Sequence, residues 1–201
     1  MTRQAAPATL EDTLAWALAL VARGVADRRH PFHTPVLATT GLDGTPQART
    51  VVLRGIDPAT RQLRLHTDAR AGKVAELAAE PRATLMFYDA GAQLQLRLGG
   101  RATLHRDDAL ADEAWAASRD FSRMCYAIEP APGQAVPAPP AAPLDSQAGR
   151  PHFCVVILHL HTLESLHLAA GGHRRARFAW DQASIPSGTP SGTPSGTWLV
   201  P

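Results

Sequence analysis

Short segments of alternating polar and apolar residues, joined by tight-turn sequences, run through most of this 201-residue chain. In the clearest segment, Leu94, Leu96 and Leu98 alternate with polar or small residues, which is the period of a strand with one buried face. Asp43 and Gly44 form a pair typical of the two-residue hairpin turn, which requires positive φ. Hairpins join antiparallel neighbours, whereas a parallel doubly wound sheet needs a helix between nearly all of its strands. The pattern therefore predicts a mainly β (α+β) fold, an antiparallel barrel with peripheral helices.

The same reading gives an order of elements along the chain. Strands are expected at 36–40, 47–56, 63–68, 83–89, 94–105, 153–169 (one long strand or two broken ones) and 173–180. Helices are expected at 9–25, 70–80 and 106–119. In the first helix, apolar residues recur at every third or fourth position and Thr9 is placed to cap the start. In the second helix we expect Val74, Leu77 and Ala78 to face inward.

Composition divides the chain into a domain and two irregular segments. Residues 1–183 are expected to form a single domain. Within it, residues 130–151 are rich in Pro and Ala without any period, which favours a long loop. Residues 184–201 carry the repeat SGTPSGTPSGT, which is too short and polar to bury anything. We expect this last segment to be a flexible tail.

Charge and cysteine content exclude several classes of protein. The formal net charge is only +2, which argues against a nucleic-acid-binding surface. No apolar run reaches the ~18–20 residues of a membrane helix, and the first residues lack the layout of a secretory signal. Cys125 and Cys154 form no paired motif, so a disulfide framework or a zinc site is not expected. We therefore expect a cytoplasmic protein with neither a nucleic-acid nor a membrane partner.

Basic residues gather where two expected strands meet the second helix. Arg49 shares a strand face with Val51 and Leu53, where a charge is costly unless it meets an anion. The run TDARAGK (67–73) adds a hydroxyl, two cations and the free amides of a helix start. The run is not a P-loop, because the upstream glycine is missing and Val74 follows Lys73. Two interpretations remain open: an anion site, or a set of surface salt bridges.

Three runs in this region resemble a known family. QARTVVLRG, LHTDARAGKVAEL and LQLRLGGRATL resemble, in this order, three motifs of the pyridoxamine 5'-phosphate oxidase-like FMN-binding family. Those motifs are Arg-x-Val-Leu-Leu-Lys, Tyr/Phe-Thr-x-x-x-Ser-x-Lys and Gln-Val-Arg-x-x-Gly. WAASRDFSRMCYAIEPAPG and SLHLAAGGHRRARF resemble the oxidase-related branch of that family, so the resemblance spans roughly residues 9–181. The matched positions are Arg49, Arg54, His66, Thr67, Lys73, Gln95 and Gly100; Arg54 stands where Lys is usual, and His66 where an aromatic residue is usual.

The resemblance implies a split β-barrel homodimer with FMN at the subunit interface and a small-molecule substrate. It implies that Arg49, Thr67 and Lys73 hold the FMN phosphate, with Arg70 as a further contact. The isoalloxazine would lie beside the backbone of three residues, Thr50, Val51 and Val52. Its polar edge would bond Gln95. The C-terminal segment of the family usually lends a Trp and an Arg; here Leu166 stands near the Trp position, and Arg175 or Arg177 near the Arg position.

The late segment departs from the true oxidase. Its substrate-binding Arg-x-His pair is replaced by HRRAR (173–177), so vitamin B6 activity is not carried over, although His173 and Arg174 remain candidates for an anionic substrate. The implied function is an FMN-dependent oxidoreductase in which the flavin carries the hydride. The alternative is a non-catalytic protein of the same fold that binds flavin or haem. The deazaflavin F420 also remains open, and His159 and His161 are either metal or haem ligands or hydrogen-bonded strand residues.

Overall fold

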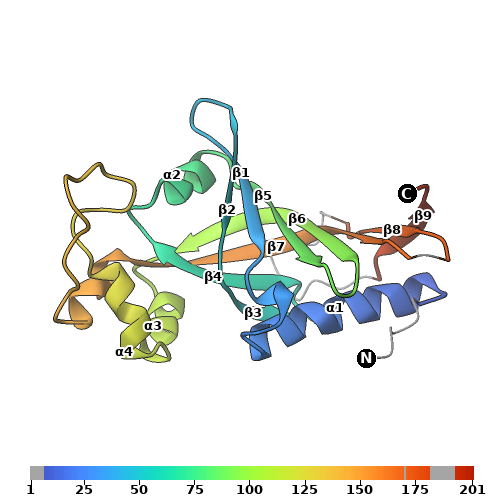
Figure 1. The fold of residues 1–201 in the computed structure, drawn as a ribbon, viewed down its shortest axis with the longest axis horizontal. Coiled ribbons are helices and arrows are strands. Elements are labelled where there is room, and N and C mark those ends of the chain that lie inside the picture. Colours follow the sequence, from blue (N-terminus) through green and yellow to red (C-terminus); the bar gives the residue numbers. More distant parts are fainter. Residues whose placement is uncertain (1–6, 170, 182–192) are drawn as a thin grey trace.

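The long strand β7 (Phe153–His167) organises the sheet in the computed structural model, which describes residues 7–169, 171–181 and 193–201. One edge of β7 pairs antiparallel with β6 (Leu94–His105) over its whole length. The other edge pairs first with β4 (Gln62–Asp68) and then with β8 (Arg174–Ala179). The change of partner near Leu160 divides the sheet into two arms, which is the split of the barrel (Figure 1).

The main path of the sheet runs β2-β1-β5-β6-β7-β4-β3, and every pairing is antiparallel. Its remaining strands are β1 (Val36–Thr40), β2 (Pro46–Thr50), β3 (Leu53–Asp57) and β5 (Arg82–Asp89). The two ends of the path, β2 and β3, are separated in sequence only by Val51 and Val52. The sheet therefore curls until its ends meet, as a barrel does. This arrangement confirms the predicted antiparallel split barrel.

The expected strand over 47–56 is wrong, because the chain breaks at Val51 and Val52. The residues before the break pair with β1, and those after it pair with β4. Arg49 and Leu53 therefore belong to different strands and do not share a strand face. The run TVVL is apolar and rich in β-branched residues, which favour extended structure. The sequence pattern therefore predicts one continuous strand and does not indicate the break.

Helices cover the barrel at its edges. They are α1 (Leu10–Ala26), α2 (Gly72–Ala79), α3 (Ala109–Ala116) and α4 (Asp120–Arg123), with short 3₁₀ turns η1 (Pro31–His33), η2 (Met124–Tyr126) and η3 (Gln147–His152). The hydroxyl of Thr9 accepts a hydrogen bond from the Asp12 amide at 3.1 Å, which caps α1 as expected. Figure 1 places α3 and α4 at the opposite end of the molecule from β8.

Two helices are shorter than predicted. Helix α2 begins at Gly72 rather than at 70, and of its expected inward residues only Leu77 is buried, whereas Ala78 is exposed. Helix α3 begins at Ala109 because Asp108 caps it, accepting a bond from the Ala111 amide at 2.9 Å. Between η2 and η3 the chain forms neither helix nor strand, as the Pro/Ala-rich composition predicted.

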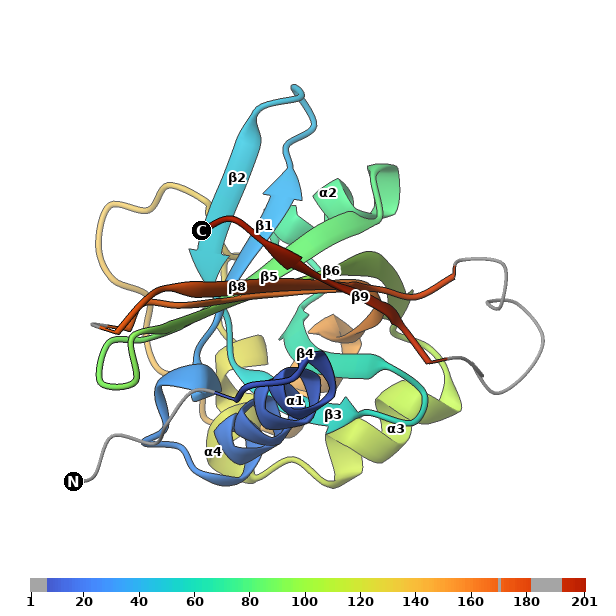
Figure 2. The same ribbon diagram turned by 90° about the vertical axis from the view of Figure 1, so that its right-hand side faces the viewer.

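The tail prediction is wrong for part of its length. Residues 195–199 form β9 (Ser195–Leu199), which pairs antiparallel with β8. Strand β8 otherwise presents an open edge, and Thr197 and Trp198 favour extended structure, so a short strand adds there. Residues 182–192, which carry part of the repeat, lie outside the described residues. Figure 2 shows the β8–β9 layer between α1 and the β1–β2 hairpin.

The interior is apolar and falls into two clusters. The larger fills the barrel beneath α1, with Phe32, Leu37, Leu85 and Leu98 at 1% exposure or less. The smaller packs Trp115 of α3 with other aromatic side chains against the first residues of β7. Among the described residues, no helix is both long and apolar enough to cross a bilayer.

Candidate functional site

A group of charged and hydroxyl side chains joins α2 to strands β1, β2 and β4. Arg49 of β2 donates from Nη2 to Oε2 of Glu76 at 2.7 Å. Its Nη1 donates to the hydroxyl of Thr39 on β1. That hydroxyl in turn donates to the same Glu76 oxygen at 2.5 Å. Arg49 is 23% exposed and Glu76 12%, so the pair is largely removed from water.

Lys73 completes this group from the first turn of α2. Its Nζ donates to the hydroxyl of Thr67 at 3.2 Å, at the end of β4. Burial lowers the pKa of Lys73, and the positive charge of Arg49 lowers it further, whereas Asp68 and Glu76 oppose the shift. An anion bound between two neighbouring cations would relieve the repulsion between them, so this pair favours anion binding. We call Arg49, Thr39, Thr67 and Lys73 the α2 donor group.

The structure thus brings together three of the expected phosphate ligands and adds two residues. Sequence reasoning missed Thr39 and Glu76. The one available signal was the position of Glu76, three residues after Lys73 and therefore on the same helix face. A guanidinium, an ammonium and two hydroxyls suit a phosphate group well, so the donor group fits the cofactor phosphate. The Glu76 carboxylate, which contacts the donor group, carries a charge that opposes a phosphate.

Arg70 serves a different purpose from the rest of the basic run. Its Nε and Nη2 bond both carboxylate oxygens of Asp68, at 3.0 and 2.8 Å. Its Nη1 bonds Glu129 at 2.6 Å, and Nη2 also reaches the carbonyls of Tyr126 and Ile128. All three nitrogens therefore have partners, and Arg70 fastens the segment after η2 to the end of β4. A contact from Arg70 to phosphate would require it to release one of these bonds.

Apart from the α2 donor group, a basic cavity of about 200 Å³ lies between the sheet and the α3–α4 region. At Arg54 the β3–β4 register shifts, which makes Arg54 the extra residue of a bulge. Arg54 Nε, Arg64 Nε and His66 Nε2 are buried and have no hydrogen-bond partner among the described residues. The cavity, which no carboxylate lines, is formed by Arg28, Arg54, Arg64, His66, Ala114, Ala117, Ser118, Arg119, Ser122 and Tyr126. We call it the basic cavity.

His66 is neutral in this cavity. Burial lowers its pKa to about 3, with the charges of Arg54 and Arg64 adding to the effect. Its ring packs edge-on against Phe153 with centroids 4.9 Å apart, which fixes its orientation. Buried polar atoms without partners are costly, so the cavity suits a ligand that pairs with these three nitrogens.

The segment 49–54 connects the two basic groups. Arg49 lies at one end in the α2 donor group, and Arg54 lies at the other in the basic cavity. Between them the backbone leaves both strands, and the Val51 amide donates to the carbonyl of Pro35 at 2.9 Å. Thr50, at the end of β2, is exposed, and Val51 and Val52 are half-buried. A ligand lying along residues 50–52 would have an anion site at each end.

The remaining candidates lie on the face of the sheet away from Arg49. Gln95 on β6 is opposite Leu166 on β7, and Leu166 is opposite Arg175 on β8, so these three form one row. Gln95 alternates with buried leucines and faces outward. By contrast, Arg49 is opposite Leu37, Leu37 is opposite Leu85, and Leu85 is opposite the buried Leu98. Residues directly opposite each other on paired strands share a face of the sheet. Arg49 therefore lies on the inner face of the sheet.

Arg175 and Arg177 differ in their surroundings. Arg175 donates to Glu164 from Nε and Nη2, at 3.1 and 2.8 Å. Arg177 is opposite Glu164 in the β7–β8 register and is exposed. Within one chain, therefore, the expected ring-contacting residues and the expected phosphate ligands do not converge.

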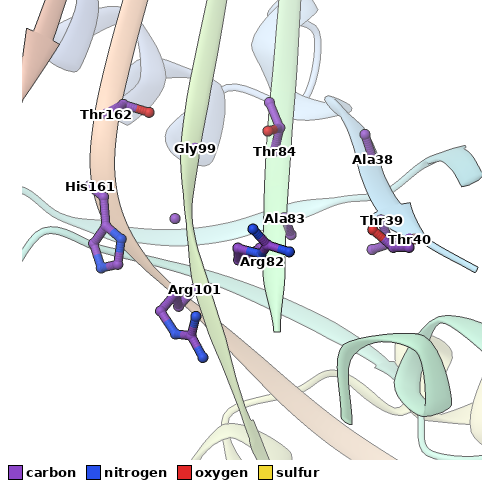
Figure 3. Close-up of a pocket in the computed structure, with 11 residues that line it drawn as sticks. Ala38, Thr39, Thr40, Arg82, Ala83, Thr84, Gly99, Arg101, His161 and Thr162 are labelled. Carbon is purple, nitrogen blue, oxygen red and sulfur yellow. The ribbon is translucent and has the colours of Figure 1, made fainter. Parts of the chain in front are cut away.

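An open hollow of about 430 Å³ lies on this outer face (Figure 3). Arg82 and Arg101 from adjacent strands lie directly opposite each other at its rim, with His161 of β7 beside them. Its lining includes Gly100, next to the point where the β6–β7 register shifts. A Cβ on Gly100 would lie 2.0 Å from the carbonyl oxygen of His159, so only glycine fits there.

His159 and His161 do not gather further ligands. His159 is linked through the Thr103 hydroxyl to His105, at 3.2 and 2.9 Å. Burial is the main cause that lowers the pKa of both His159 and His161. Over the described part of the chain, no three His, Cys, Asp or Glu side chains come together as a possible metal site.

Comparison with solved structures defines the class of this fold. An FMN-binding protein related to pyridoxamine 5'-phosphate oxidase, from Nostoc punctiforme, superposes with a TM-score of 0.72 at 23% identity, over 92% of this chain and 96% of that one. PhzG from Burkholderia lata, solved with tetrahydrophenazine-1-carboxylic acid, gives 0.66 at 20% identity, over 96% and 90%. The protein is a split β-barrel of this type.

Sequence comparison gives the family. The family model described as pyridoxamine 5'-phosphate oxidase matches residues 25–141, which is more than half of the chain. Pyridoxine/pyridoxamine 5'-phosphate oxidase 2 of Arabidopsis thaliana is 30% identical over 143 residues, or 66% of this chain and 72% of the plant protein. The bacterial enzyme of Cupriavidus taiwanensis is 37% identical over 101 residues, which span 46% of its length. The chain belongs to the pyridoxamine 5'-phosphate oxidase family, as the motifs predicted.

Proposed function

We propose that this protein is an FMN-dependent oxidoreductase that acts on a small anionic substrate, with each cofactor site completed by a second copy of the chain. The observation that carries the proposal is the pair of basic sites joined by residues 49–54. One site has donors suited to a phosphate monoester, and the other is a cavity with three orphaned nitrogens.

Arg49, Lys73 and Thr67 would hold the FMN phosphate from the inner face, assisted by Thr39. The half-buried backbone of Val51 and Val52 would lie along the flavin ring. When bound, the flavin supplies the hydride chemistry, and the chain binds and orients the reactants. Arg54 and His66 thereby face a substrate placed beside the ring.

The substrate class follows from the charge of the basic cavity. Four arginines line it without any carboxylate, and neutral His66 offers one further hydrogen bond. A neutral substrate would leave the buried Nε atoms of Arg54 and Arg64 without an anionic partner, which is costly. The names of the relatives are consistent with an anion: the curated oxidases act on 5'-phosphates, and PhzG was solved with a carboxylic acid.

A homodimer accounts for the separation of the candidate residues. Gln95 and Arg175 lie on the outer face, whereas Arg49 lies on the inner face, so one chain presents two half-sites. In a two-fold dimer, the outer row of one subunit can meet the donor group of the other. Met86 and Tyr88, at 37% and 49% exposure, lie on the same outer face and would supply apolar contacts to the second subunit.

Anaerobic reduction of the bound flavin tests the proposal. The FMN-loaded protein is mixed with a panel of phosphate esters and carboxylates that carry an oxidisable amine or alcohol, and with their uncharged analogues. We expect reduction only by anionic members of the panel, and we expect Arg54→Ala to slow it. Arg23→Ala, at an exposed position of α1 that lines neither basic site, serves as the matched control and should reduce at the wild-type rate. Equal reduction by charged and uncharged compounds would contradict the anionic substrate class.

A further inference from the structure

Glu76 occupies the position in which an anion would be expected. Its Oε2 accepts from Arg49 at 2.7 Å and from the Thr39 hydroxyl at 2.5 Å. These are two members of the α2 donor group, and both would otherwise bond a phosphate oxygen. The pKa of Lys73, the other cation of the α2 donor group, is lowered by the charge of Arg49 and raised by the charge of Glu76. A carboxylate of this chain therefore occupies the position expected for the bound anion.

The placement of Glu76 is specific. It lies on α2 with only 12% of its side chain exposed, whereas Glu80, at the end of the same helix, bonds the exposed Arg82 at 2.7 Å. A carboxylate and a phosphate repel each other, and the low dielectric of a buried site strengthens that repulsion. Phosphate and Glu76 therefore compete for Arg49.

We propose that Glu76 is an internal counter-ion that competes with the cofactor phosphate for Arg49, so that FMN is held as an exchangeable ligand. The inference rests on the proposed function. It assigns two effects to one carboxylate: Glu76 stabilises the empty protein by neutralising Arg49, and it lowers the affinity for FMN.

A different role for Glu76 predicts the opposite result. If Glu76 served only to orient Arg49 toward phosphate, its removal would weaken FMN binding. If it served only to hold α2 in place, its removal would lower stability with and without FMN alike. Competition alone predicts lower stability of the empty protein together with tighter FMN binding.

The experiment compares Glu76→Gln with Glu80→Gln, which makes the same charge change on the same helix away from Arg49. Flavin fluorescence gives the dissociation constants for FMN and for riboflavin, which lacks the phosphate. The melting temperature of each protein is also measured with and without FMN. We expect Glu76→Gln to bind FMN at least about fivefold more tightly, to bind riboflavin unchanged, and to melt lower when empty. Glu80→Gln should match the wild type in affinity.

Two results would overturn the inference, and they are distinct. Unchanged or weaker FMN binding by Glu76→Gln, when the wild type binds FMN, rejects competition and leaves the proposed function standing. Absence of FMN binding by the wild type and both variants rejects the proposed function and the inference with it. A parallel titration with inorganic phosphate, read by the melting temperature, should show the same preference for Glu76→Gln.

Discussion

Arg49 and Glu76 lie 2.7 Å apart across the interface between β2 and α2, and their charges meet where a phosphate group would be expected. Thr39 and Lys73 extend this contact to β1 and to the first turn of α2. Residues 50–52 then lead from Arg49 to the basic cavity. The proposed cofactor site and the proposed substrate site therefore share one short stretch of chain and the elements that it separates.

Removing either cation of the α2 donor group should weaken FMN binding. Arg49→Ala and Lys73→Ala should each cost about 1.5–3 kcal/mol, the range for hydrogen bonds to charged groups. Titration calorimetry with FMN and riboflavin measures this, because only the phosphate-bearing ligand should be affected. Unchanged FMN affinity in both variants would mean that the phosphate lies elsewhere.

Replacing His66 should change how stability depends on pH. The folded pKa, about 3, lies below the ordinary value of 6.5, so the unfolded chain binds more protons between these values. Stability should therefore fall as the pH decreases from about 6.5 toward 3. His66→Phe keeps the ring against Phe153 and should reduce that dependence, measured by urea unfolding at several pH values. His173→Gln, at an exposed position, should behave as the wild type; equal pH profiles for all three proteins would contradict the buried, neutral imidazole.

A methyl group at the bulge of β6 should destabilise the sheet. Gly100→Ala places a Cβ 2.0 Å from the His159 carbonyl oxygen, so backbone must move. We expect a loss of at least about 2 kcal/mol in the free energy of unfolding, at the upper end of typical single substitutions. Gly171→Ala adds the same group where no atom lies within 4 Å, and should be nearly neutral. Similar effects in both would show that the close approach is absent.

A charge on the outer sheet face should disrupt the proposed homodimer. Tyr88 is opposite Gln95 and is 49% exposed, so Tyr88→Glu would place an unpaired carboxylate in the proposed interface. Sedimentation should then show a smaller species and weaker FMN binding together. Leu42→Glu, at an exposed position in the β1–β2 hairpin, should leave both properties unchanged. A dimer that persists in Tyr88→Glu would place the interface elsewhere.

Much of the barrel was predictable because alternation and hairpin turns are local signals. The strand at 36–40 and the strand at 94–105 were predicted with the bounds the structure gives, and 153–169 was close to β7. The break at Val51 and Val52 was not predictable, since it arises from barrel closure rather than local preference. Strand β9 was missed because its composition is that of a linker, and its partner strand decides its structure.

The candidate site was predictable only where a motif named its residues. Arg49, Thr67 and Lys73 come together as the resemblance implied. Glu76 and Thr39 were missed, because only the packing of α2 against β1 and β2 brings them to Arg49. The exposure of Arg54 to the basic cavity depends on a bulge, and Arg70 was drawn into a different network by Glu129. The surroundings of Glu76, Thr39, Arg54 and Arg70 therefore depend on tertiary contacts, which residue types alone do not predict.

The absorbance spectrum of the purified protein, before and after incubation with FMN and removal of the excess, tests the central claim most directly. We expect the bands of oxidised flavin at one FMN per chain, and their loss in the double variant Arg49→Ala, Lys73→Ala. A haem spectrum, or a spectrum that shows protein alone after incubation with FMN, would contradict it.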